Sequence, residues 1–172
     1  VVLWGDHGWK LGEHNGWCKQ TNYEIDNRSP LIISVPDAQA NGQSSDSLVE
    51  FVDVYPTLCD LAGLTVPESL EGTSLKPLLH DSTATVKDAA FSQFRRKHKG
   101  REYMGYTMRT DLYRYVEWID RKTAKTIERE LYDHRTDPQE NANVASHKSN
   151  RDIVRELSSK LWATLDRPAP SS

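Results

Sequence analysis

The stretch WGDHGWKLGEHNGWCK, residues 4–19, has no apolar period of two or of nearly four, so it is not a packing segment. The apolar residues Val1–Trp4 that lead into it are typical of a strand buried inside a sheet. Gly5 ends this strand, and Asp6 and His7 follow at once. Because doubly wound sheets bind ligands at the carboxyl edge of their strands, this order predicts an α/β fold with a site at that edge.

Composition excludes several classes of protein. The chain has 172 residues, of which 37% are hydrophobic and 27% charged, as in globular domains. The net charge of −3 gives no overall field for nucleic acid or an anionic membrane, and no apolar run is long enough to cross a bilayer. We therefore expect neither nucleic acid nor membrane as a partner. Two cysteines, Cys18 and Cys59, are too few for a disulfide framework.

The chain divides into three predicted parts. Residues 1–88 are expected to belong to an α/β domain, residues 89–166 to a small antiparallel-sheet subdomain with a terminal helix, and residues 167–172 to a disordered tail. Because a strand in a core needs neighbours on both edges, a chain that opens inside one is expected to be the C-terminal piece of a longer protein.

Two elements are predicted in the first part. The run Leu31–Val35, closed by Pro36, is typical of a strand buried on both faces in a parallel layer. Asp53 is expected to cap a helix that stops at Gly63.

The second part is rich in β-branched and aromatic residues, which favour strands. Four segments predict an antiparallel sheet: Phe91–Arg95, Tyr103–Thr110, Tyr113–Ile119 and Glu128–His134. A tight connection at Asp111-Leu112 predicts a hairpin between two of them. Apolar residues at helical spacing predict a packed C-terminal helix capped by Ser149, and they are Ile153, Val154, Leu157, Leu161, Trp162 and Leu165.

The candidate site begins with a carboxylate and an imidazole side by side, Asp6 and His7, both of which bind divalent metals. Taken alone, the pair favours a turn in which Asp6 caps local N–H groups over a metal site. Lys19 lies in the same stretch. A lysine near a divalent cation is unfavourable unless both face one multiply charged anion, so the cluster predicts a site for a sulfate or phosphate ester.

These residues carry a resemblance to a known family. Asp6-His7-Gly8, Gly12-Glu13-His14, Lys19, Tyr23-Glu24, Arg28 and Pro30-Leu31-Ile32 resemble the second conserved block of the type I sulfatases, in the alkaline-phosphatase-like superfamily. The later stretches VDVYPTLCDLAGL, MGYTMRTDLYRYVEW and ELYDHRTDPQENANVA continue the resemblance in collinear order, most closely in the iduronate-2-sulfatase branch. The resemblance implies the C-terminal portion of an alkaline-phosphatase-like sulfatase fold.

The resemblance also implies roles for single residues. Asp6 and His7 match two ligands of the family's single Ca²⁺, although many relatives have Asn in place of His7. Lys19 matches the lysine that binds the sulfate and helps the ester oxygen to leave. His14 either touches substrate or orients Lys19 from behind, and the second role is favoured.

Some parts of the family's site are missing from this chain. The nucleophile is a formylglycine made from a C-x-P-S-R type motif, and neither Cys18 nor Cys59 fits that motif. The other acidic metal ligands also lie upstream in the family. The resemblance therefore implies a partner, the missing N-terminal half of the same enzyme, and a chain that is inactive alone. Members of the family that it resembles are usually secreted, periplasmic or lysosomal.

The predicted function is a sulfuric ester hydrolase acting on a sulfated carbohydrate, such as a uronate 2-O-sulfate in a glycosaminoglycan-like polysaccharide. A phosphodiesterase or phosphonate monoester hydrolase of the same superfamily is one alternative, and a non-catalytic polyanion-binding module is another. The basic run Arg95–Arg101 is either a solvated loop or a contact for neighbouring sulfates and uronates. In the second case Arg95 would bind substrate.

Overall fold

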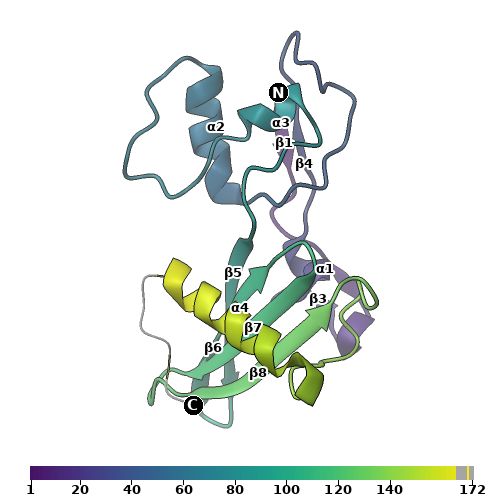
Figure 1. Ribbon diagram of the computed structural model, residues 1–172, viewed down its shortest axis with the longest axis vertical. Helices are drawn as coiled ribbons and strands as arrows, with labels where there is room; N and C mark the ends of the chain where they lie inside the picture. Colours follow the sequence, from purple (N-terminus) through teal and green to yellow (C-terminus); the bar gives the residue numbers. More distant parts are fainter. Residues whose placement is uncertain (166–169, 171–172) are drawn as a thin grey trace. The chain divides into compact units, whose positions relative to one another are not determined.

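The computed structural model describes residues 1–165 and 170 and contains two compact units (Figure 1). The first unit comprises Val1–Gly5 and Pro30–Ala90, and the second comprises Asp6–Ser29 and Phe91–Ser172. The chain therefore passes between the units three times.

The predicted division follows sequence order, whereas the compact units do not. The boundary expected after residue 88 lies close to Ala90, but residues 6–29 group with the C-terminal sheet instead of with the N-terminal strands. The tail predicted over 167–172 lies outside the described residues, apart from Pro170. Within the described part of the chain, no helix combines the length and apolar character that a membrane span requires.

In the first unit, β1 (Val2–Trp4) pairs with β4 (Leu31–Ile33) in a two-stranded sheet. The pairing is antiparallel, with Leu3 opposite Ile32. The expected parallel layer, buried on both faces, is therefore wrong for these strands. A two-stranded ribbon has no inner strand to be covered, and Leu3, Trp4 and Ile32 are each more than half exposed.

The helical part of this unit begins with η2 (Phe51–Asp53), followed by α2 (Val54–Leu61) and α3 (Lys76–His80). Gly63, with φ 68°, follows the end of α2 as predicted. Asp53 is the N-cap residue of α2 as predicted, but its carboxylate makes no capping hydrogen bond to that helix. It is buried and accepts hydrogen bonds from the backbone N–H groups of Glu50 and Thr73 and from Lys87 Nζ, at 2.7 to 2.8 Å.

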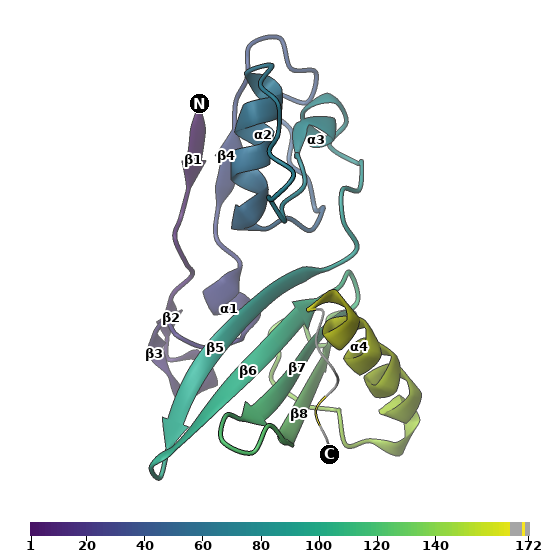
Figure 2. The same cartoon turned by 90° about the vertical axis from the view of Figure 1, so that its left-hand side faces the viewer.

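The second unit contains the predicted antiparallel sheet, in strand order β5-β6-β7-β8 (Figure 2). The strands are β5 (Ala90–His98), β6 (Arg101–Arg109), β7 (Tyr113–Asp120) and β8 (Thr126–Asp133). The predicted hairpin joins β6 to β7, where Thr110 N–H donates to the Tyr113 carbonyl at 2.8 Å. The four-stranded fold expected from the aromatic and β-branched segments is confirmed.

The predicted terminal helix, α4 (Arg151–Thr164), covers one face of this sheet (Figure 2). Leu157, Leu161 and Trp162 are its buried residues. The helix begins after Asn150, one residue later than the Ser149 cap predicted. The packed C-terminal helix of the expected fold class is confirmed.

At the centre of this interface lies Glu117 of β7, which is fully buried. Its carboxylate accepts hydrogen bonds from Tyr115 Oη at 2.6 Å, Ser158 Oγ at 2.5 Å and Trp162 Nε1 at 2.9 Å. Burial by itself raises the pKa of Glu117, but these donors outweigh it and the pKa lies below its ordinary value.

The opposite face of the sheet receives residues 6–29. Successive side chains of a strand point to opposite faces, so Arg114, Val116 and Trp118 of β7 lie on the face away from Glu117. Figure 2 shows β2, β3 and α1, the elements of residues 6–29, on the side of the sheet opposite α4. This sheet face is the platform on which the candidate site is built.

Candidate functional site

Residues 6–29, called the site loop below, contain a short hairpin and one helical turn. Strand β2 (Lys10–Leu11) pairs with β3 (Trp17–Cys18) across η1 (Glu13–Asn15), and α1 (Glu24–Asn27) follows. The hairpin is closed tightly because Gly12 has φ 133° and the Glu13 carboxylate accepts the Leu11 N–H at 2.6 Å.

The structure brings together three of the residues predicted for the site. His7 Nε2 lies 3.2 Å from Asp6 Oδ2 and 2.5 Å from Lys19 Nζ. The side chain of Asp6 is 82% exposed and that of His7 25% exposed, so the cluster is open to solvent at Asp6. Residues 13 positions apart are thus placed around one point by the hairpin.

The tautomer of His7 follows from its contacts. Nδ1 lies 2.7 Å from the carbonyl oxygen of Gly8, which can only accept, so Nδ1 carries the proton. Nε2 then carries the lone pair and accepts from the Lys19 ammonium. The same lone pair is the one that would ligate a metal, so metal binding by His7 requires Lys19 to turn away from Nε2.

His14 is held by aromatic contacts. Its ring stacks on Tyr23 with centroids 3.8 Å apart and planes 7° from parallel, and Tyr23 meets the edge of Tyr132 at 5.8 Å. His14 also has a φ of 54°, which the hairpin imposes. Among the described residues His14 has no contact with Lys19, so its favoured role of orienting that lysine stays a prediction, and what the structure gives is the stack of His14 on Tyr23.

Two tryptophans of the site loop are exposed. Trp17 is 69% exposed and Trp9 52% exposed, and the Trp9 ring stacks against His7 with centroids 6.0 Å apart. Exposed aromatic surface next to polar groups is typical of ligand-binding sites.

Beneath these exposed residues the site loop has a buried ion pair that the sequence pattern did not reveal. Lys10 and Asp26 are 2% and 3% exposed, with Lys10 Nζ 2.5 Å from Asp26 Oδ2. Thr21 Oγ1 also donates to Asp26 Oδ2 at 2.5 Å. Gly8 N–H donates to the Asp26 carbonyl at 2.9 Å, and a side chain at position 8 would collide with the backbone of Ile25.

The site loop is fixed to the sheet by a second buried polar group, the anchor network of Glu24, Arg109, Arg114, His134 and Glu140. Arg114 of β7 donates to the carboxylates of both Glu24 and Glu140. Glu140 lies 26 positions from Arg114 and 116 from Glu24, and no spacing rule joins residues so far apart, so the sequence offered no signal for these contacts.

The basic run is part of the β5–β6 hairpin and not a loop. Arg96 of β5 lies over the Trp118 ring, 4.8 Å from its centroid. It also lines a small cavity, of about 20 Å³, with Thr21, Asn22, Tyr23, Trp118 and Glu130. Alternation along the strand directs Arg95, which is exposed, to the opposite face. Substrate binding by Arg95 stays a prediction, and Arg96 is the basic residue that faces the site loop.

Two further predictions concern the thiols and the metal. Cys18 is exposed and Cys59 buried, and both are free. Asp6 and His7 offer a carboxylate and an imidazole lone pair within reach of one ion, which fits a share of a divalent cation site. Ca²⁺ takes six to eight oxygen ligands. These two residues would therefore supply only part of such a coordination shell.

Comparisons with known proteins agree with this architecture. Residues 12–167 match the family described as N-sulphoglucosamine sulphohydrolase, C-terminal. Over the whole chain it is 32% identical to arylsulfatase K of Mus musculus, covering 31% of that protein. It is 33% identical to the N-acetylglucosamine-6-O-sulfatase of Bacteroides thetaiotaomicron over 95% of this chain, covering 29% of that enzyme.

A solved structure of a protein in complex with its substrate, D-glucosamine-2-N,6-O-disulfate, matches 98% of this chain and 35% of that one, with 29% identity and a TM-score of 0.79. The chain thus spans less than a third of the two curated relatives. Both are named as sulfatases and neither as an iduronate-2-sulfatase, so that branch stays a prediction. On the family match over 12–167, the chain belongs to the sulfatase family, in its N-sulphoglucosamine sulphohydrolase C-terminal group.

Proposed function

We propose that this chain is the C-terminal part of a sulfuric ester hydrolase that removes sulfate from a sulfated carbohydrate. The observation that carries the proposal is the convergence of Lys19, His7 and Asp6 within hydrogen-bond distance at the exposed face of the site loop. An ammonium that can face a sulfate ester, beside an imidazole and a carboxylate that can hold a cation facing the same group, suits an anionic ester.

Lys19 would bind the sulfate through its ammonium and neutralise the ester oxygen as the alcohol leaves. His7, with its proton held on Nδ1 by Gly8, presents its Nε2 lone pair to Lys19 when no cation is bound. When a cation takes that lone pair, Lys19 would turn from His7 to the sulfate. Trp9 and Trp17 offer apolar surface on which the sugar ring would pack.

We also propose a divalent cation, Ca²⁺, held in part by Asp6 and His7. When bound, it would polarise one sulfate oxygen. The remaining ligands and the formylglycine nucleophile would come from the N-terminal part of the enzyme, so this chain alone should bind sulfate esters without hydrolysing them.

The finer part of the proposal is the sugar. The iduronate-2-sulfatase resemblance of the sequence favours a uronate 2-O-sulfate in a glycosaminoglycan-like polysaccharide. Two of the relatives named above are instead named for, or bound to, glucosamine or N-acetylglucosamine sulfates. Matched 2-O-sulfated uronate and 6-O-sulfated glucosamine disaccharides are therefore the substrates to compare.

The deciding experiment measures sulfate release by an enzyme in which this chain is joined to its N-terminal part. Lys19→Ala should lower kcat by about 10²-fold or more, the loss typical of one stabilising group in an active site. Lys122→Ala, which removes an exposed lysine of the second unit, is the matched control and should leave kcat unchanged.

Two outcomes would overturn the proposal. Faster turnover of a phosphonate or phosphodiester than of any sulfate ester would favour the other hydrolases of the superfamily. Salt-sensitive binding of heparin that needs neither Lys19 nor a metal, without any turnover, would favour a polyanion-binding module.

A further inference from the structure

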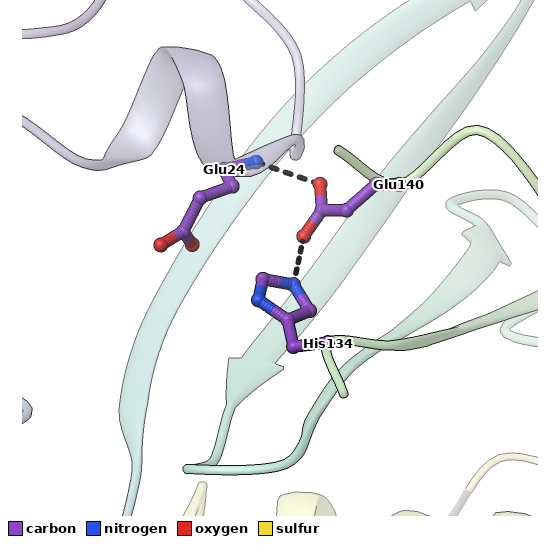
Figure 3. Close-up of side chains that lie close together, drawn as sticks. All are labelled: Glu24, His134 and Glu140. Carbon is purple, nitrogen blue, oxygen red and sulfur yellow. Dashed lines mark hydrogen bonds and ion pairs between the residues drawn. The ribbon is translucent and has the colours of Figure 1, made fainter. Parts of the chain in front are cut away.

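Glu140 is a buried carboxylate far in sequence from the candidate site. It lies after β8 and is 1% exposed. Its Oε2 accepts the backbone N–H of Glu24 at 2.7 Å, while Oε1 accepts from Arg114 Nε at 2.5 Å and from His134 Nε2 at 2.7 Å. Figure 3 shows Glu140 between the Glu24 backbone and the His134 ring.

The cluster has the ligand types of a metal site, since ligand atoms of Glu24, His134 and Glu140 lie within 4.8 Å of one another. The charges argue against a metal. Arg114 donates to both carboxylates, and Arg109 Nε lies 3.5 Å from Glu24 Oε2. Two guanidinium groups already balance two carboxylates, so a cation would first have to displace Arg114. The contacts are those of a structural anchor.

Burial by itself raises the pKa of Glu140, but the contacts from His134, Arg114 and the Glu24 N–H outweigh it, and the pKa lies below its ordinary value. The residue is therefore ionised at neutral pH, and its three donors act on a full negative charge. Hydrogen bonds to a charged partner are about twice as strong as neutral ones.

Glu140 binds the Glu24 backbone, and the segment around Glu24 lies close to both His7 and Lys19 of the candidate site. Glu24 follows Lys19 by five residues, and Asp26, two residues further on, accepts the N–H of Gly8 beside His7. A shift of the Glu24–Asp26 backbone would therefore move His7 and Lys19 relative to each other.

We propose that Glu140 is a positioning residue of the sulfate site, which acts through the Glu24 backbone and Arg114 to set the distance between His7 and Lys19. The inference rests on the proposed function for its meaning, because the His7–Lys19 contact matters only if that pair binds the ester. Displacing a catalytic group by about 1 Å can cost about 10²-fold in rate.

The test compares Glu140→Gln with Glu117→Gln. Both replace a buried, multiply bonded glutamate of the same unit, but Glu117 lies on the α4 face and does not touch the site loop. In Glu140→Gln we expect the rate of backbone amide exchange over residues 6–29 to rise about tenfold. This is the rise that corresponds to losing roughly one hydrogen bond to a charged group. The imidazole ¹⁵N shifts of His7 should also change. In Glu117→Gln the site loop should exchange as in the unmodified chain, with His7 unchanged.

Equal changes in the two variants would overturn the inference, as would a Glu140→Gln protein with wild-type exchange and an unmoved His7. Should Glu140→Gln fail to fold, Glu24→Gln removes the charge to which Arg114 donates while keeping the backbone donor, and must show the same changes more weakly. These readouts need no turnover. Failure of the sulfatase proposal would appear separately, as unchanged His7 and Lys19 signals when inorganic sulfate is added to the unmodified chain.

Discussion

The two lysines of the site loop stand in opposite surroundings. Lys10 is 2% exposed and bound to a buried carboxylate, whereas Lys19, nine residues later, is exposed and bound to an imidazole. The first belongs to the buried base of the loop and the second to its exposed end. The contrast teaches that the contacts that hold the loop and the groups available for chemistry are separate sets of residues, so stability and ligand binding should respond to different substitutions.

The largest loss of stability is expected at the buried base. Asp26→Ala leaves the Lys10 ammonium buried without its carboxylate, and breaking a buried pair in this way costs about 3–5 kcal/mol. Denaturant unfolding of the variant measures this loss. The double variant Lys10→Met, Asp26→Leu removes both charges and should recover most of the stability. If the single and double variants are equally stable, the Lys10–Asp26 ion pair does not hold the site loop in place.

A smaller loss is expected where the two ends of the site loop meet. A Cβ added at Gly8 would lie 1.7 Å from the Ile25 carbonyl oxygen, which belongs to the backbone and cannot give way cheaply. Gly8→Ala should cost about 1–3 kcal/mol, as overpacking does in a core. Amide exchange should rise in residues 6–29 and not in α4. Increased exchange in α4 as well would show that the loop and sheet open as one body.

Three carboxylates of the second unit change the free energy of unfolding in opposite directions as the pH changes. The pKa values of Glu117 and Glu140 are lowered on folding, so their stabilisation is present above the unfolded value of 4.5 and is lost as the pH falls through the folded values. Burial raises the pKa of Glu130, more than its bonds from Trp118 and Tyr132 lower it, so its ionisation weakens the fold as the pH rises above 4.5.

Glu117→Gln should therefore destabilise the chain at neutral pH by roughly 1–3 kcal/mol and much less in acid. Glu130→Gln should leave the stability at neutral pH unchanged or raised. Unfolding free energies measured between about pH 3 and pH 7 test both signs. A loss of stability at neutral pH in Glu130→Gln would contradict the prediction.

The sequence predicted the elements and contacts that depend on neighbouring residues, and it missed those that depend on residues far apart in the chain. Aromatic and β-branched segments predicted the sheet, and helical spacing predicted α4, because these patterns are local and periodic. Asp6, His7 and Lys19 lie within one short stretch, so the sequence could name them together as candidates and the structure places them together, while their roles stay predictions. Lys10 and Glu140 were not found, since their partners are set by tertiary packing and no period relates them. The prediction of a parallel layer was wrong because an apolar run does not determine which strand it will pair with, or in which direction.

The smallest effect on stability is expected at the exposed end of the loop. There the contrast between Lys19 and Lys10 can be tested most directly. Lys19→Met removes an exposed ammonium whose partner, His7, stays in contact with Gly8 and Asp6, so the unfolding free energy should change by no more than about 0.5 kcal/mol. Titration of inorganic sulfate, followed by the His7 nitrogen shifts, should meanwhile show no binding. Lys122→Met, with the same change at an exposed position, should alter neither quantity. If Lys19→Met were as destabilising as Asp26→Ala, Lys19 would belong to the base of the loop, and a role in holding a sulfate would lose its support.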